Sequence, residues 1–142
     1  MRPDISFFVR CIPPKVTSQQ KGVFSLGLGK GVRFFKKKAV LDSEKILSAL
    51  FIPHRPAKPL EGPITVSICW MFPYRKGEPK ARRGLGIPCD VRPDLDNLNK
   101  TTCDVLQKLA FFKDDGQISA LFLEKKWQEP SGISVCIGGI KS

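Results

Sequence analysis

The strongest constraint on the fold of this chain is a nine-residue run of alternating side chains at residues 64–72. Every second residue from Ile64 to Phe72 is large and apolar. The residues between them are Thr65, Ser67, Cys69 and Met71. A period of two is the pattern of a β-strand that buries one face. The run therefore predicts a strand with one buried face.

Further runs predict more strands. Residues 5–12 and 133–137 alternate in the same way, and one or two short strands are expected around residues 32–35. Residues 118–123 are almost continuously apolar, which is typical of a central strand that is buried on both faces. A long loop is expected at about residues 73–92, and loops of this length inside a domain are usually functional or mobile.

Two helices are predicted. The first is expected to begin at residue 42 or 43, both good N-cap types, and to end before Pro53. Its expected apolar face consists of Ile46, Leu47, Leu50 and Phe51. The second helix is expected at about residues 95–109, where apolar residues recur at three- and four-residue steps. These residues are Leu95, Leu98, Thr102, Val105 and Leu109. The sequence predicts one α+β domain spanning residues 1–142, in which two helices pack on a mixed β-sheet.

The net charge of the chain indicates the class of molecule that it binds. Lys and Arg number 24 against 13 Asp and Glu, a net charge of +11. Such an excess favours a polyanionic partner, either nucleic acid or an anionic membrane surface, over a basic protein with no charged partner. No run approaches the roughly 20 apolar residues that a membrane span needs, and no signal peptide pattern follows Met1. We therefore expect no membrane association.

The cysteines and the single histidine argue against zinc chemistry. The five cysteines are widely spaced and form no C-x-x-C pair, so neither a disulfide framework nor a structural zinc site is expected. His54 is the only histidine, which excludes any multi-histidine metal site. This cysteine usage fits a reducing compartment.

Two pairs of acids are the candidate chemical groups. Asp94 and Asp96, the first acid pair, lie at the start of the predicted second helix. Asp96, Lys100 and Asp104 follow at four-residue steps and share one helix face. A purely structural role is also open, with Asp96 as an N-cap and Asp96–Lys100 as a surface ion pair worth about 0.5 kcal/mol.

The second acid pair, Asp114 and Asp115, precedes Gly116, and on its own this sequence is ordinary turn chemistry. The strand at 118–123 must return along the second helix to bury Leu121 and Leu123. It therefore brings the two acid pairs together if it enters the sheet near the start of that helix, or if a partner chain supplies one of the pairs.

Clustered carboxylates are costly without a cation. Two charges about 5 Å apart repel by about 3 kcal/mol at an effective dielectric constant of 20. Oxygen ligands suit Mg²⁺ or Mn²⁺ rather than zinc. In a basic chain, such a cation would act on a phosphate backbone held by the basic residues, with Lys100 adding a fixed positive charge nearby.

The residues expected to bind the DNA backbone are basic and lie mostly in predicted loops and hairpins. They are Lys15, Arg33, Lys36, Lys37, Arg75, Lys76, Arg82, Arg83, Arg92 and Lys125.

The acid motifs resemble those of the RusA family of Holliday junction resolvases. The likeness rests on R-P-D-L-D-N-L-N-K at residues 92–100, then Asp104, then F-F-K-D-D-G-Q-I at residues 111–118. Weaker similarities are the I-P-P-K element that ends at Lys15, where Cys11 or Ile12 replaces the usual glycine, and the basic aromatic hairpin at residues 31–35. Lys125 or Lys126 resembles a family lysine that ends the strand after the second acid pair.

The resemblance implies an endonuclease that cuts four-way DNA junctions with Mg²⁺, for which Mn²⁺ can substitute, as a homodimer and without a small-molecule cofactor. It matches Asp94, Asp96 and Asp115 to the metal-binding acids and Lys100 to the catalytic lysine, with Asp114 as a neighbouring acid and a further candidate metal ligand. It also implies a bacterial or phage-encoded protein that acts at DNA in the cytoplasm, in recombination and repair.

The substrate also favours a dimer. Resolving a four-way junction needs two symmetric nicks, and one D-L-D-N run supplies one cutting centre, so two chains about a two-fold axis match the junction. Two alternatives stay open at this point. One is a non-catalytic nucleic-acid-binding module, and the other is a metal nuclease that acts on other branched DNA.

Overall fold

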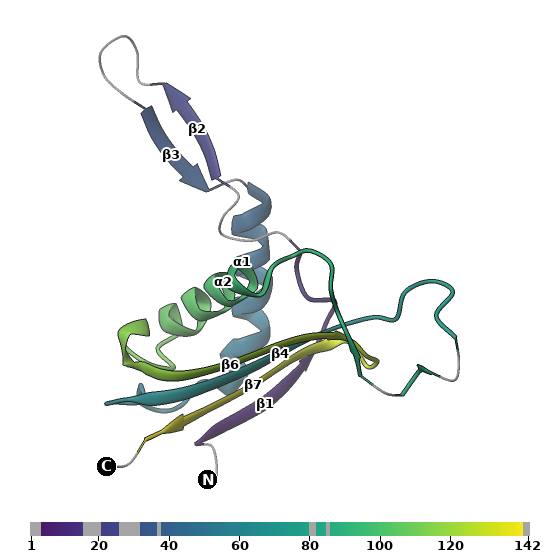
Figure 1. Ribbon diagram of the computed structural model, residues 1–142. Helices are drawn as coiled ribbons and strands as arrows, with labels where there is room; N and C mark the ends of the chain where they lie inside the picture. The colour runs from purple at the N-terminus through teal and green to yellow at the C-terminus, as the bar shows by residue number, and fades with distance from the viewer. Residues whose placement is uncertain are drawn as a thin grey trace.

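The structure is a computed structural model that describes residues 4–15, 21–25, 32–36, 38–79, 82–84 and 86–140. Its main sheet has five strands in the order β1-β7-β4-β6-β5. The strands are β1 (Ile5–Arg10), β4 (Ile64–Phe72), β5 (Ile87–Pro88), β6 (Ile118–Trp127) and β7 (Gly132–Gly139). A separate hairpin of β2 (Lys21–Ser25) and β3 (Val32–Lys36) projects away from this body (Figure 1).

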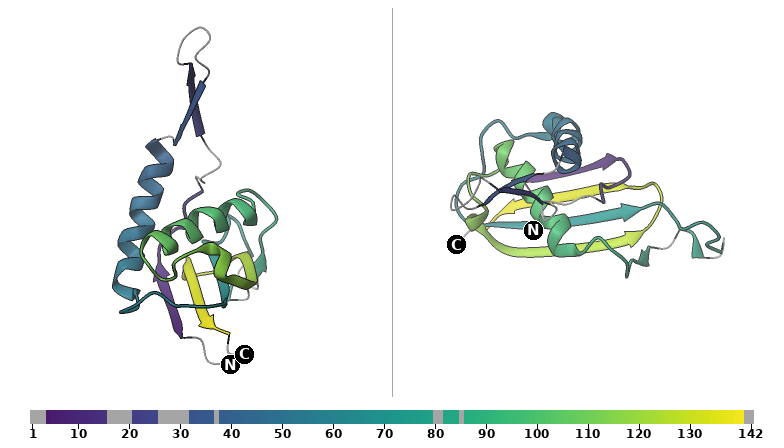
Figure 2. Two further views of the ribbon diagram at one scale, coloured as in Figure 1. Left: turned by 90° about the vertical axis from the view of Figure 1, so that its left-hand side faces the viewer. Right: turned by 90° about the horizontal axis from the view of Figure 1, so that it is seen from above.

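The two long helices are α1 (Lys38–Phe51) and α2 (Leu95–Lys108). The helix α2 lies across one face of the sheet, and α1 packs beside it on the side of β1 (Figure 2). Where α1 packs against β1, the rings of Phe51 and Phe7 meet edge to face, with 5.5 Å between their centroids. The sheet is mixed, because β4 pairs in parallel with β6 and antiparallel with β7. The predicted α+β architecture, two helices on a mixed sheet, is confirmed.

The strand predicted from alternation at residues 64–72 is confirmed as β4, and all five of its large apolar side chains are buried. At its centre Trp70 packs under α2 and donates a hydrogen bond from Nε1 to Thr102 Oγ1 at 3.3 Å. The predicted second helix is also confirmed, with Leu98, Val105 and Leu106 buried against the sheet. In both elements, the spacing of the apolar residues correctly predicts which face is buried.

The predicted start of the first helix is wrong. The helix α1 begins at Lys38, four residues before Asp42, because Val40 is fully buried and extends the buried stripe of Leu47 and Phe51 by two turns. Packing of this apolar stripe therefore outweighs the choice of capping residue. The expected apolar face is also only partly right, since Ile46 is exposed.

The prediction that residues 118–123 form the central strand is also wrong. Within the described part of the chain, β4 is central, and β5 pairs with β6 only at Lys126 and Trp127. Most of β6 therefore has an unpaired edge. Leu121, expected to be buried, is 40% exposed and Phe122 is 64% exposed, whereas Leu123 packs against the core. An apolar run alone does not show whether its side chains are buried within the same chain or by a second molecule.

Two other features bear on the sequence predictions. All five cysteines are free thiols, and the ring of His54 stacks on Phe7 with 4.5 Å between ring centroids. In the described residues, no helix combines the length and the apolar character that a membrane crossing requires.

Candidate active site

The first acid pair lies on the surface at the start of α2. Asp94 occupies the N-cap position in an extended conformation, but its side chain makes no capping hydrogen bond to the helix. Its backbone carbonyl instead accepts from Leu98 N at 3.0 Å, and Asp96 lies in the first turn. Both side chains are exposed. The carboxylate of Asp94 is thus not used for helix capping, and the helix dipole favours negative charge at this position.

The segment before Asp94 is fixed to the end of β6. Lys125 Nζ donates hydrogen bonds to two backbone carbonyls, Val91 O and Pro93 O, the latter at 2.9 Å. Lys125 O in turn accepts from Cys89 N at 3.2 Å. Lys125, predicted as a DNA contact, therefore holds in place the loop that leads into the first acid pair.

The second acid pair lies in a tight turn, the 3₁₀ helix η3 (Asp115–Gln117). Asp114 caps this turn by accepting from Gly116 N at 3.0 Å, while Gln117 Oε1 accepts from Asp114 N at 3.0 Å. Asp115 N donates to Gln107 Oε1, at the far end of α2, at 3.2 Å. The second acid pair is thus attached to the last turns of the helix.

The carboxyls of the second acid pair interact with each other. The pKa of Asp114 is lowered, first by the hydrogen bond from Gly116 N and then by one from the Asp115 side chain. The pKa of Asp115 is raised by the same hydrogen bond to Asp114, with further contributions from burial and from the charges of Asp114 and Asp104. The side chain of Asp114 therefore caps the turn, and the carboxyls of both members of the pair are exposed.

A shallow pocket of about 320 Å³ joins Asp115 to the exposed face of α2. Lys100, Asp104 and Asn99 line it from the helix, and residues 118–121 line it from β6. Cys103 lies at its base, and burial, with smaller effects of Asp104 and Asp115, raises the pKa of that thiol to about 12. Asp104 and Asn99 are pocket residues that were not among the predicted site residues, although the four-residue step from Lys100 to Asp104 indicated the shared face.

The two acid pairs lie at opposite ends of α2 in one chain. Leu95 and Gln107 are twelve helical steps apart, which span about 18 Å. The strand β6 gives a similar length, since its seven steps from Ile118 to Lys125 span about 23 Å. In the described residues, no three Asp, Glu, His or Cys side chains are close enough to hold a metal ion. The strand β6 thus enters the sheet near the end of α2 and not near its start, the position that would bring the two acid pairs together within one chain.

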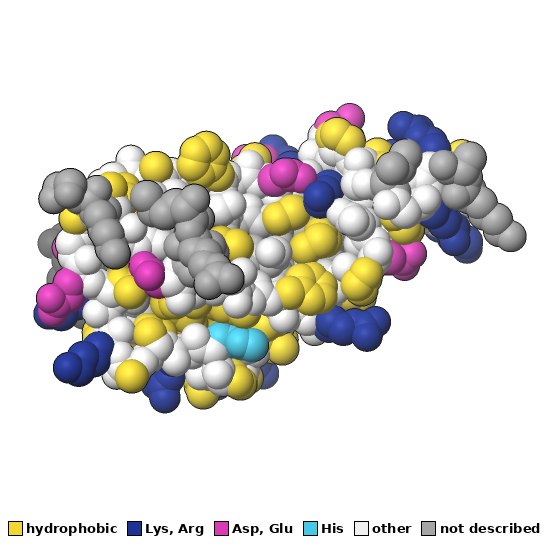
Figure 3. All heavy atoms as spheres, turned by 90° about the horizontal axis from the view of Figure 1, so that it is seen from below, with side chains coloured by type: hydrophobic (Ala, Val, Ile, Leu, Met, Phe, Trp, Pro, Cys, Tyr) yellow, Lys and Arg dark blue, Asp and Glu magenta, His cyan; other side chains and the backbone are white. Residues whose placement is uncertain are grey.

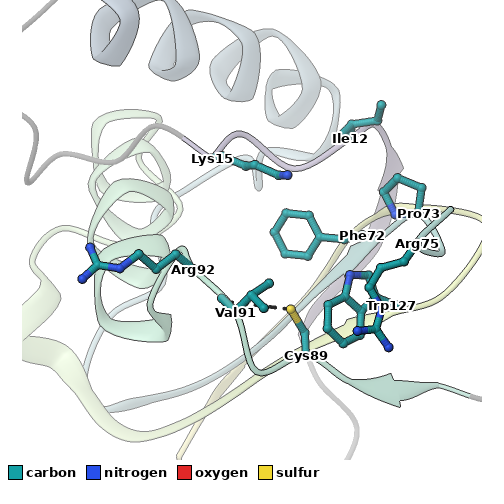
Figure 4. A pocket seen from close by; sticks show the side chains of 9 residues that line it. All are labelled: Ile12, Lys15, Phe72, Pro73, Arg75, Cys89, Val91, Arg92 and Trp127. Carbon is teal, nitrogen blue, oxygen red and sulfur yellow. Dashed lines mark hydrogen bonds between the residues drawn. The ribbon is translucent and has the colours of Figure 1, made fainter.

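Apart from Lys125, the predicted basic residues fall into three groups. Lys15, Arg75 and Arg92 line a second pocket near the start of α2 (Figure 4). Lys76, Arg82 and Arg83 lie on the loop after β4, which projects at one end of the molecule (Figure 2). Figure 3 shows Lys and Arg side chains gathered at this projecting end.

The remaining predicted basic residues belong to the hairpin region. Arg33 and Lys36 lie in β3, where only the backbone is described, and Lys37 lies outside the described residues.

Comparison with known proteins assigns the family. A family model for the endodeoxyribonuclease RusA matches residues 12–138, which include both acid pairs, Lys100 and both helices. A comparison with curated proteins found no match. Because the family model covers nearly the whole chain, the chain belongs to the RusA family of endodeoxyribonucleases, which indicates a DNA-binding nuclease of the Holliday junction resolvase type.

Proposed function

We propose that the protein is a Mg²⁺-dependent homodimer that resolves four-way DNA junctions by paired symmetric nicks, in recombination and repair in a bacterial or phage-infected cell. The observation that supports this most strongly is the distribution of acids along α2. Asp94 and Asp96 lie at one end of the helix and Asp115 at the other, all three exposed, in a chain with a net charge of +11.

A two-fold axis explains this separation. An axis perpendicular to α2 near its middle makes the two helices of a dimer antiparallel, so that the start of one helix faces the end of the other. Asp94 and Asp96 of one protomer then meet the partner's Asp115. Symmetry produces two such centres in each dimer, one for each nick.

The exposed edge of β6 is suited to packing against a second copy of the chain. Leu121 and Phe122 are exposed on this strand, and Leu121 also lines the pocket that contains Asp115. An exposed apolar edge strand favours pairing with or covering by another chain. The same surface that brings in the partner therefore borders the second acid pair.

The donor set proposed for the dimer would suit Mg²⁺. Asp94, Asp96 and the partner's Asp115 would offer carboxylate oxygens, which Mg²⁺ and Mn²⁺ prefer. When bound there, the ion would polarise the phosphate and lower the pKa of a bound water. Lys100, one turn from Asp96, would place a positive charge where the phosphate gains negative charge in the transition state.

Junction binding by the dimer is expected to depend steeply on salt. A dimer carries twice the +11 of one chain, and each phosphate contact contributes about 0.9 to the slope of log affinity against log salt. With about 6 to 10 contacts, affinity should fall by about 10³ to 10⁵ between about 50 and 200 mM salt. Fluorescence anisotropy of a labelled junction measures the slope, and a slope below about 2 would argue against backbone binding by the basic surface.

A cleavage assay tests the proposed function. The protein is mixed with a four-way junction labelled on each strand in turn, with Mg²⁺, with Mn²⁺ or with EDTA. Paired nicks at symmetric positions in two opposing strands, lost in EDTA, are expected. Tight binding without cleavage in either metal would indicate a non-catalytic binding module. Faster cleavage of flapped or three-way substrates would indicate a nuclease for other branched DNA.

A further inference from the structure

A second pocket, of about 200 Å³, lies where β1, β4 and β6 end, beside the loop that leads into α2 (Figure 4). Its floor is aromatic, because Phe72 and Trp127, which are paired in register across β4 and β6, both contribute to it. Both side chains are buried and belong to the hydrophobic core. The floor is therefore rigid and formed in advance of any ligand.

Cationic side chains surround this aromatic floor. Lys15 reaches over the space that the Phe72 ring points into, and Arg92 extends from the opposite rim with its guanidinium directed away from Trp127 (Figure 4). Arg75 stacks on the Trp127 ring at 4.0 Å and is held by an ion pair to Glu78 at 3.4 Å. No acidic residue is among the described residues that line the pocket. The site thus suits a flat apolar group attached to negative charge.

We infer that this pocket holds one unstacked nucleobase of the DNA strand, with its flanking phosphates on Lys15 and Arg92. A base can stack on the half-exposed guanidinium plane of Arg75, which rests on the Trp127 ring, and basic side chains bind the backbone on either side. A pocket of this size and charge is poorly suited to a longer apolar chain, because three cations surround its short floor. The inference rests on the proposed function, since it takes DNA as the ligand.

The position of the pocket relates this base to the cut. Arg92 is two residues before Asp94, so their Cα atoms are at most about 7 Å apart. Lys125 fixes the carbonyls on both sides of Arg92, which holds the pocket rim and the first acid pair as one unit. A base in the pocket is therefore a close neighbour of the phosphate that is cut. Unstacking a base costs least where pairing is already interrupted, so the pocket favours a branch point over linear duplex.

Abasic scanning tests this inference by binding, independently of cleavage. Junctions that lack a single base at successive positions around the branch point are titrated with protein in EDTA. We expect one position in each cut strand at which loss of the base weakens affinity by about 10-fold, the size of one base–aromatic stack. Uniform affinity across all positions would overturn the pocket assignment, whether or not the junction is cut.

A pocket-filling variant gives the matched control. Val91 is 51% exposed on the rim, so Val91→Trp is expected to fill the pocket without disturbing the core, whereas Val91→Ala leaves it open. Val91→Ala should keep the position-dependent effect, and Val91→Trp should abolish it. If circular dichroism shows that Val91→Trp is unfolded, Val91→Phe replaces it. Position-dependent affinity that survives in the folded, filled variant would contradict the inference. Absence of cleavage by the wild type in Mg²⁺ would count against the proposed function alone.

Discussion

Replacing Asp94, Asp96 or Asp115 with asparagine is expected to reduce junction cleavage by about 10³-fold or more, while junction binding stays intact or becomes tighter. Each substitution removes a negative charge that would hold the metal ion but leaves a side chain of the same size. Binding is preserved because a carboxylate near phosphate is repulsive. Single-turnover cleavage and anisotropy in the absence of Mg²⁺ measure the two effects separately.

Asp42 supplies the matched control for these substitutions. It is exposed on α1, on a different element from both acid pairs, so Asp42→Asn makes the same chemical change elsewhere on the surface. Its cleavage rate should equal that of the wild type. Normal cleavage by all three site variants would show that these acids take no part in the cutting reaction.

The double variant Leu121→Thr/Phe122→Thr is expected to convert the proposed dimer into a folded monomer that does not cut junctions. Each side chain is worth about 1.5 kcal/mol when buried, and symmetry counts each one twice in a dimer. The dissociation constant of the dimer should therefore rise by about 10³-fold or more. Threonine retains the β-branched shape that strands favour, so β6 itself should persist. Sedimentation equilibrium gives the dissociation constant, and cleavage is assayed at the same protein concentrations.

Phe8→Thr is the control for the edge variant. Phe8 is also an exposed aromatic residue on a strand, but β1 lies at the opposite edge of the sheet from β6. This substitution should leave both dimerisation and cleavage intact. An unchanged dissociation constant in the β6 variant would exclude this edge as the interface.

Sequence patterns predicted the elements whose burial is set within the chain. The strand β4 and the helix α2 were found where their periods placed them, because Trp70 and Leu98 are buried by neighbours in the same molecule. The turn at Asp114 also followed from local chemistry, since its side chain caps the next residues. In each case, the residues of a single segment are enough to predict the local structure.

The failed predictions depend on contacts that no single segment encodes. The start of α1 depends on how Val40 packs, and the exposure of Leu121 depends on which side of β4 the strand β6 joins. The motif around Asp94 predicts candidate acids, but it does not indicate the direction in which β6 leaves Asp115 relative to α2. The contacts of Lys125 with Val91 and Pro93 join segments more than 30 residues apart, and no local pattern indicates them.

Mixing two inactive variants tests most directly whether each metal centre is shared between protomers. In a heterodimer of Asp94→Asn with Asp115→Asn, a shared arrangement places both substitutions in one centre and leaves the other centre intact. The heterodimer, prepared by co-expression with two different tags, should therefore nick one strand of the junction at about the wild-type rate per intact centre. If each centre is built within one chain, both centres are damaged and the heterodimer is as inactive as either parent, which would contradict the account.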